Sequence, residues 1–252
     1  MGERVVAPTQ APPQLALPAP VLANPPPPGF TDLATIEGLW IEVRYATPDN
    51  FMSAPLTGYG VAGAWLRDEA AEALAEVVAD LRSEGLGLRV YDAYRPTRAS
   101  AAMVAWASRT RQLHLLHDGY IGARSLHSAG VALDVTLVEL PDGTPMGMGS
   151  AWDTFTEASH YKNAEWPASF NRELLRSHMR AHGFRGYSKE WWHFTFPAEL
   201  PEYLDVPYAC FEPAAGDWVP PRGWQRPGWR APPHDGEPSA CLPPAPDADQ
   251  TK

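Results

Sequence analysis

The chain has 252 residues, of which 28 are proline and 20 are glycine, and its formal net charge is −10. This length suits one domain with material left over at the ends, and a hydrophobic content of 44% with 10 tryptophans is typical of a globular protein. An acidic chain repels phosphate backbones, so nucleic acid is not an expected partner. The net charge does not restrict small substrates, because the local field of a cleft can oppose it.

No apolar run approaches the ~20 residues that a membrane-spanning helix needs. The first residues, MGERVVAPTQAPPQLALPAP, are interrupted by proline too often for the apolar segment of an export signal. The protein is therefore expected in the cytoplasm, or in the periplasm or outside the cell if a signal has been removed.

Cys210 and Cys241 form no CxxC pair, and no disulfide framework is expected. Nothing in the sequence predicts the oligomeric state.

Composition divides the chain into three parts. Residues 1–30 form a proline-rich arm, residues 31–211 a folded body, and residues 212–252 a proline-rich tail. Both ends are expected to be extended and mostly disordered, because proline-rich segments favour open conformations without a packed core.

The first expected element of the body is a strand over 38–46 (GLWIEVRYA). The segment 58–63 (GYGVAG) satisfies the GxGxxG pattern of nucleotide-binding loops, but Pro55 interrupts the place where the preceding strand would have to lie. We interpret it as a flexible turn.

A helix is expected over 67–85, with Gly85 at its C-terminal end. Four apolar residues define the buried face of this helix: Leu74, Val77, Val78 and Leu81.

The second expected strand covers 86–94 (LGLRVYDAY), and Thr97 is expected to cap the helix that follows over 98–111. The remaining elements are a strand over 131–138, a helix over 169–183 that ends at Gly183, and a last strand over 190–196. Strands and helices are mixed, and several strands are short. This order favours an α+β fold, with helices packed against a mostly antiparallel or mixed sheet.

The stretch SLHSAGVALDVTL, residues 125–137, places a carboxylate within an otherwise apolar strand. Alternation puts Asp134 on the face opposite to the core residues Val131, Leu133, Val135 and Leu137. Gly130 allows the chain to turn, so that His127 can lie over the Asp134 face. A His–Asp hydrogen bond would satisfy this arrangement, and so would a metal ion that both residues bind.

The last strand favours the metal ion. In SKEWWHFTF, Glu190 and His193 are three residues apart and would face opposite sides of a regular strand. They converge only if Glu190 lies in the turn before the strand or at a bulge, and we predict that it does. His127, Asp134 and His193 would then be three metal ligands with a fourth position open to water, which is the arrangement of a catalytic zinc ion. Glu190 would be the general base.

Arg95 ends the strand that contains RVYDAYRP, next to Pro96. A guanidinium group at a strand end can hold an oxyanion or a substrate carboxylate by paired hydrogen bonds. Taken alone, Arg95 would instead be interpreted as the ion-pair partner of Asp92 or of a glutamate.

These motifs together resemble those of the zinc D-alanyl-D-alanine dipeptidases, the VanX-type enzymes. SLHSAGVALDVTL matches their SxHxxGxAxD pattern, and EWWH matches their ExxH motif. The resemblance covers most of residues 37–196 and excludes both proline-rich ends. It continues, in the family's order, through RYATPDNF at 44–51, YDAYRPTRA at 91–99, PMGMGSAWDTF at 145–155 and EASH at 157–160.

The resemblance implies a zinc site in a cleft on the sheet, with one zinc ion per chain bound by His127, Asp134 and His193. It implies that Glu190 is the catalytic base and that Arg95 stabilises the transition state. It also suggests that the substrate is bound by Ser125 and Asp153, with Tyr45 near the pocket. The implied substrate is the dipeptide D-Ala-D-Ala, which ends peptidoglycan precursors.

Two alternatives remain open at this point. The chain could be a related zinc carboxypeptidase or peptidoglycan peptidase that acts on longer peptides, or a zinc-binding module without activity. The presence of both Glu190 and Arg95 argues against the module, because zinc binding alone needs neither a base nor an oxyanion partner. A set of two histidines and one aspartate also accepts divalent ions other than zinc.

Overall fold

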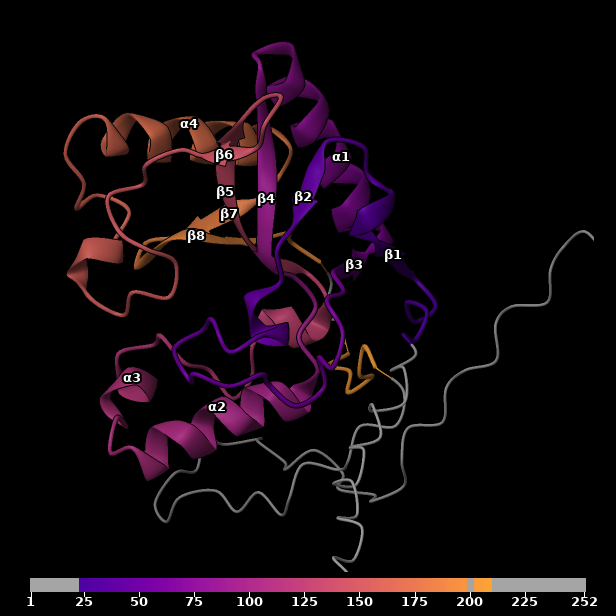
Figure 1. Cartoon of the computed structure of the whole chain (residues 1–252), viewed down its shortest axis with the longest axis vertical. Coiled ribbons are helices and arrows are strands. Elements are labelled where there is room, and N and C mark those ends of the chain that lie inside the picture. The colour runs from indigo at the N-terminus through magenta and orange to yellow at the C-terminus, as the bar shows by residue number, and fades with distance from the viewer. Residues whose placement is uncertain (1–22, 199–201, 210–252) are drawn as a thin grey trace, which may run out of the picture.

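A mixed sheet of six strands forms the centre of the protein (Figure 1). The computed structural model describes residues 23–198 and 202–209. Five strands follow the order β2-β4-β5-β8-β7, and β6 pairs with β5. β2 and β4 are parallel, whereas the other pairs are antiparallel. The strands are β2 (Leu39–Ile41), β4 (Leu86–Asp92), β5 (Ala132–Glu139), β6 (Thr144–Pro145), β7 (Arg185–Tyr187) and β8 (Glu190–Thr195). The α+β fold with a mixed sheet is therefore confirmed.

Two further strands, β1 (Phe30–Asp32) and β3 (Trp65–Arg67), form a small antiparallel sheet that the sequence did not predict. The strand expected over 38–46 is shorter than predicted. It ends at Ile41, and a 3₁₀ helix, η2 (Arg44–Ala46), follows it. This turn places the buried side chain of Tyr45 in the wall of a cavity.

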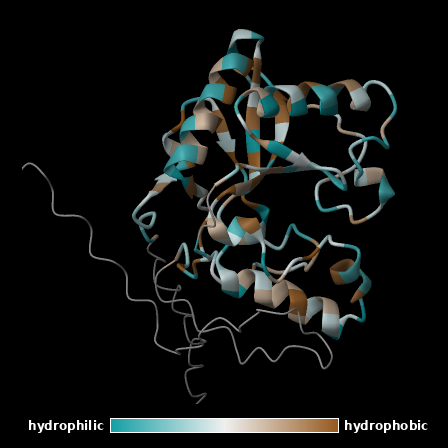
Figure 2. Cartoon of the chain, turned by 180° about the vertical axis from the view of Figure 1, so that it is seen from behind, coloured by the Kyte–Doolittle hydropathy of each residue, from teal (hydrophilic) through white to brown (hydrophobic). Residues whose placement is uncertain are grey.

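The helices α1 (Asp68–Ser83) and α4 (Ala168–Ala181) pack against each other and against the sheet, as Figure 1 shows. All four apolar residues predicted for the inner face of α1 are buried. Figure 2 shows hydrophilic and hydrophobic residues alternating along these helices, while hydrophobic residues gather in the central strands. This is the pattern that burial of one helix face against a sheet produces.

Two further helices, α2 (Thr97–Arg109) and α3 (His114–His117), contact each other and lie below the sheet in Figure 1. The predicted cap of α2 is wrong, because Thr97 is the first residue of the helix and Pro96 occupies the N-cap position without a side-chain hydrogen bond. The extended backbone of Pro96 already starts the helix. The backbone N–H of Thr97 binds the carbonyl oxygen of Leu204, which ties the helix start to the C-terminal part of the domain.

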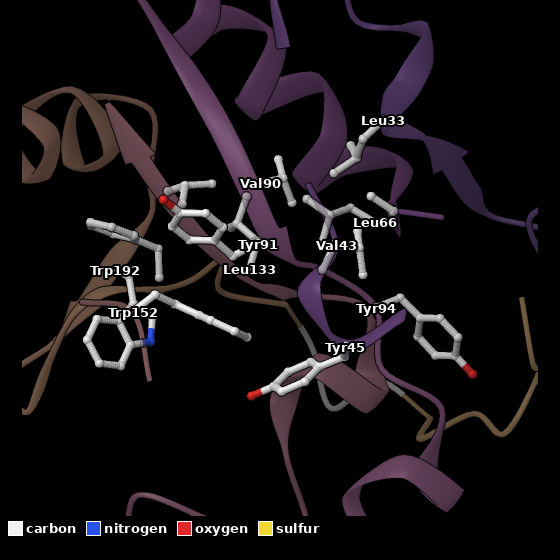
Figure 3. Packing of buried hydrophobic residues seen from close by; sticks show 14 of the residues in the cluster. Leu33, Val43, Tyr45, Leu66, Val90, Tyr91, Tyr94, Leu133, Trp152 and Trp192 are labelled. Carbon is white, nitrogen blue, oxygen red and sulfur yellow. The ribbon is translucent and has the colours of Figure 1, made fainter. Parts of the chain in front are cut away.

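Strand β5 is the most deeply buried element of the sheet. Leu133, Val135 and Leu137 lie in the hydrophobic core as expected, but the opposite face, with Asp134, is covered as well. Figure 3 shows the aromatic side chains around Leu133, among them Tyr91, Trp152 and Trp192. A carboxylate on this strand is therefore removed from bulk water and needs partners.

The ends of the described region lie side by side. Ala23 forms a β-bridge with Ala209, and the side chain of Asn24 donates to the carbonyl oxygen of Pro207. Residues 23–30, which the sequence placed in the arm, thus contact the body, while the domain boundaries stay predictions. Cys210, Cys241 and the tail over 212–252 lie outside the described residues. Among the residues described, no helix is both long and apolar enough to span a bilayer.

Candidate metal centre

The structure brings together the three side chains predicted as metal ligands. Nδ1 of His193 lies 3.0 Å from Oδ1 of Asp134 and 3.1 Å from Nε2 of His127. The third distance, from Nε2 of His127 to Oδ1 of Asp134, is 3.4 Å. Ligands about 2.0–2.1 Å from a tetrahedral ion lie roughly 3.3 Å from one another. The three donor atoms therefore fit a single bound cation, and within the described residues they form a candidate metal site.

The local sequence explains how His127 reaches this site. It lies in a 3₁₀ helix, η3 (Leu126–Ala129), whose N-cap residue Ser125 accepts a hydrogen bond from the backbone N–H of His127. Gly130 closes the turn with a φ of 72°, and a Cβ atom there would lie 2.1 Å from the ring of Phe30. Glycine is thus required for both its backbone conformation and the close contact.

Hydrogen bonding determines which nitrogen of His127 is free to bind an ion. Nδ1 lies 2.7 Å from the carbonyl oxygen of Ala93 and 3.3 Å from Oδ2 of Asp92. Both of these atoms are acceptors, so Nδ1 carries the proton and Nε2 presents its lone pair to the site. An acceptor behind a ligating histidine is the usual means of orienting such a ring.

Asp134 is also held in one orientation. Its Oδ2 atom accepts a hydrogen bond of 3.2 Å from the indole nitrogen of Trp152, which leaves Oδ1 facing the two histidines. Burial opposes ionisation of Asp134, but His127 and His193 outweigh it and hold its pKa well below the ordinary value. Asp134 is therefore a carboxylate anion, as metal binding requires. The sequence contained no signal for the role of Trp152.

Glu190 lies beside the ligands. It is the first residue of β8, and its Oε2 atom is 4.0 Å from Nδ1 of His193. The β7–β8 ladder shifts register between Gly186 and Tyr187, which is the irregularity predicted for this position. Burial raises the pKa of Glu190 well above its ordinary value, and the carboxylates of Asp134 and Asp153 raise it further. The group thus favours holding a proton more than a solvent-exposed glutamate does.

Arg95 forms the ion pair with Asp92 that the sequence allowed, and it also lies at the cavity wall. Its Nε and Nη2 atoms donate to Oδ2 of Asp92 at 3.0 and 2.7 Å. The same guanidinium group lies over the ring of Tyr45, 5.0 Å from its centroid, and lines the cavity that contains the ligands. The ion pair with Asp92 holds Arg95 in place at the cavity wall.

The cavity has a volume of about 380 Å³, a size suited to a small ligand. It is lined by every residue that the sequence nominated for the site: Tyr45, Arg95, Ser125, His127, Asp134, Asp153, Glu190 and His193. Trp192, which the sequence allowed as a wall of the pocket, lines it too, whereas sequence reasoning missed Phe51, Tyr120, Phe155 and Tyr187. These residues lie in loops or at strand ends, where no pattern in the sequence predicts a cavity.

Asp153 and Tyr45 form a polar pair in this cavity. The hydroxyl group of Tyr45 donates to Oδ2 of Asp153 at 2.7 Å. Burial and the nearby Asp134 raise the pKa of Asp153 well above its ordinary value.

On another side of the cavity, the hydroxyl group of Tyr120 lies 2.9 Å from Nε2 of His160. The histidine of the EASH segment therefore orients a cavity residue and is not a metal ligand.

A model of the D-Ala-D-Ala dipeptidase family, peptidase M15, matches residues 28–214 of the chain. The chain belongs to this family. The D-alanyl-D-alanine dipeptidase of Enterococcus faecium is 35% identical over 197 residues, covering 71% of this chain and 98% of that protein. The D-alanyl-D-alanine dipeptidase of Escherichia coli (strain K12) is 37% identical over 187 residues, covering 72% of this chain and 92% of that protein.

A solved structure gives a weaker match. That protein is the vancomycin resistance D,D-pentapeptidase VanY in complex with Zn(II), which is 16% identical, with a TM-score of 0.36. The match covers 53% of this chain and 74% of that one, and the likeness is too distant to support a conclusion.

Membership in the D-Ala-D-Ala dipeptidase family makes this protein a hydrolase of the metallopeptidase class. It confirms the resemblance that the motifs indicated. All three candidate ligands, together with Glu190 and Arg95, lie within the matched residues. The matched region ends at residue 214, before most of the proline-rich tail.

Proposed function

We propose that this protein hydrolyses the dipeptide D-Ala-D-Ala to two molecules of D-alanine, with one zinc ion held by His127, Asp134 and His193. The observation that carries the proposal is the convergence of three donor atoms, 3.0 to 3.4 Å apart, beside a buried glutamate in a small cavity. Two imidazoles and one carboxylate form a set that suits catalytic zinc, with a position left for water.

When bound, the ion would polarise the peptide carbonyl group and make a water molecule acidic enough to react near neutral pH. The protein supplies the base. Glu190 accepts a proton from the attacking water and then delivers it to the nitrogen of the leaving D-alanine. Its raised pKa fits this double role, because a glutamate that holds a proton more readily can carry it from the water to the leaving nitrogen.

Arg95 stabilises the negative charge that develops on the peptide oxygen. Its guanidinium group is buried, lines the cavity and is fixed by two hydrogen bonds to Asp92 before any substrate binds. A charge that is already oriented need not reorganise during the reaction, which is the main advantage of such groups in a water-poor site.

The two ends of a zwitterionic dipeptide need different partners. Asp153, held by the hydroxyl group of Tyr45, offers a carboxylate for the ammonium group. Ser125 lies at the cavity wall next to η3 and offers a hydroxyl donor for the carboxylate group. A dipeptide held at Asp153 and Ser125 would lie in the same cavity that Glu190 and Arg95 line.

One observation favours the alternative of a longer peptide. The cavity adjoins a second depression, and Arg124, Leu126, Arg185 and Thr195 line both. A chain extending beyond two residues could follow this connection out of the site. Substrate length therefore distinguishes the two activities.

The test compares kcat/KM for D-Ala-D-Ala with kcat/KM for an N-acylated tripeptide that ends in D-Ala-D-Ala. Acylation removes the ammonium group that Asp153 is proposed to bind, and the extra residue of the tripeptide must extend out of the cavity. We expect the dipeptide to be hydrolysed and the tripeptide to react far more slowly. Preferential hydrolysis of the tripeptide would replace the dipeptidase proposal with a carboxypeptidase, and the Glu190→Gln variant serves as the background control for both substrates.

A further inference from the structure

Asp92 is a buried carboxylate that contacts the site from outside the cavity. It is completely inaccessible to solvent and does not line the cavity. Within the part of the chain that the structure describes, it nevertheless contacts both a predicted metal ligand, His127, and the predicted transition-state partner, Arg95.

The two oxygen atoms of Asp92 have separate partners. Oδ2 accepts both hydrogen bonds from Arg95, at 3.0 and 2.7 Å, and lies 3.3 Å from Nδ1 of His127. Oδ1 accepts a hydrogen bond of 2.5 Å from the hydroxyl group of Tyr59. One oxygen therefore faces the reacting groups, while the other is held from the opposite side.

Tyr59 comes from the GYGVAG segment, which the sequence presents as a flexible turn. The backbone does turn there, but the Tyr59 side chain is fully buried and stacks on Tyr208 with ring centroids 5.5 Å apart. Burial raises the pKa of Tyr59 well above its ordinary value, and the charge of Asp92 adds to the effect. The hydroxyl group therefore keeps its proton and acts as the donor.

We propose that Tyr59 and Asp92 are a positioning pair, in which the Tyr59 hydroxyl group fixes the rotation of the Asp92 carboxylate so that Oδ2 holds Arg95 and His127 together. The inference rests on the proposed function, because it assigns the pair to the same reaction. Neither residue touches the substrate. Their effect passes through the guanidinium group of Arg95 and through the imidazole of His127.

The physical reason is that both oxygens of the Asp92 carboxylate turn together about one side-chain torsion. Without the Tyr59 hydroxyl group, Oδ1 is a buried acceptor without its donor, and the carboxylate can rotate so that Oδ2 moves away from its partners. Oδ2 accepts from Arg95 and lies 3.3 Å from Nδ1 of His127, which also donates to the carbonyl oxygen of Ala93, so one rotation changes the contacts of both residues. Loss of groups that orient a metal ligand typically lowers metal affinity or activity by about 10- to 100-fold.

The test uses Tyr59→Phe, with Tyr94→Phe as the matched control. Both tyrosines are buried, and the Tyr94 hydroxyl group binds the backbone N–H of Val206 and has no hydrogen bond to Asp92. Each variant is measured for kcat and KM on D-Ala-D-Ala, for zinc affinity of the stripped protein in competition with a chelator, and for thermal midpoint. Tyr59→Phe should lower kcat and zinc affinity by about 10-fold each with little change in KM. Tyr94→Phe should lower only the thermal midpoint.

A second pair of variants separates positioning from general destabilisation. Asp92→Asn should lower kcat and zinc affinity at least as far as Tyr59→Phe, and adding Tyr59→Phe to Asp92→Asn should cause no further loss. Equal effects of Tyr59→Phe and Tyr94→Phe, or independent losses in the double variant, would overturn the positioning role. If the wild-type protein hydrolysed no D-Ala-D-Ala, the proposed function would fail, while the zinc affinities would still decide whether the pair orients His127.

Discussion

Asp134 and His193 are direct cross-strand partners in the β5–β8 ladder, and the Nδ1 atom of His193 lies 3.0 Å from Oδ1 of Asp134. On the other side of β5, Asp92 is the cross-strand partner of Asp134. The three residues therefore form a row across three adjacent strands of the sheet. Because backbone hydrogen bonds set the spacing along such a row, the donor atoms of Asp134 and His193 are in place before an ion binds, and Arg95 and His127 contact the row through Asp92.

The first prediction concerns Glu190. The Glu190→Gln variant should bind zinc like the wild type, because Glu190 is not one of the three converging donors. It should lose turnover by about 10²- to 10⁴-fold, since an amide cannot accept the proton. Metal content and kcat measured on the same preparations check both parts. Full turnover in the variant would remove Glu190 from the mechanism.

The second prediction concerns Arg95. Arg95→Lys keeps the positive charge but loses the paired donors that Asp92 accepts, so we expect kcat to fall by about 100-fold with a smaller change in KM. Arg98→Lys is the matched control, because Arg98 pairs with Asp205 and does not line the cavity. Equal rates for the two variants would contradict the role given to Arg95.

The third prediction concerns Asp153 in the metal-free protein. Burial and Asp134 raise its pKa in the folded state, whereas the unfolded value is about 3.9. The folded state then binds protons more tightly, so this group makes the stripped protein less stable as pH rises above about 4. Asp153→Asn removes the ionisation and keeps an acceptor for Tyr45. The variant should therefore be more stable than the wild type at neutral pH, by a margin that shrinks toward pH 4.

Thermal midpoints of the stripped wild type and Asp153→Asn, measured across this pH range, check the third prediction. The same variant should raise KM for D-Ala-D-Ala, because the proposed partner of the ammonium group is gone. A variant that is less stable than the wild type at every pH would show that the Asp153 carboxylate supports the fold and does not strain it.

Much of the site could be predicted from the sequence because its residues lie in short motifs with distinct chemistry. His127 and Asp134 lie on either side of a glycine that a tight turn needs, and Glu190 and His193 lie three apart at the start of a strand. The main helices could also be predicted from a local signal, because the buried residues of α1 recur at helical spacing.

The rest depends on contacts between distant parts of the chain. Tyr59 lies 33 residues before Asp92, and nothing in GYGVAG indicates that its tyrosine is buried against a carboxylate. Trp152 meets Asp134 only because the loop after β6 returns to the sheet. The cap predicted at Thr97 is wrong for a local reason, as Pro96 already has the extended backbone that starts a helix.

The most direct test of the central claim is a zinc titration of chelator-stripped protein, with bound metal and D-Ala-D-Ala hydrolysis measured at each point. Asp134→Asn serves as the ligand variant, and Asp142→Asn, at an exposed residue outside the cavity, as the matched control. We predict that one ion binds per chain, that hydrolysis rises in proportion to occupancy, and that only Asp134→Asn loses both. Hydrolysis by the stripped protein at the full rate, or unchanged zinc binding by Asp134→Asn, would contradict the account.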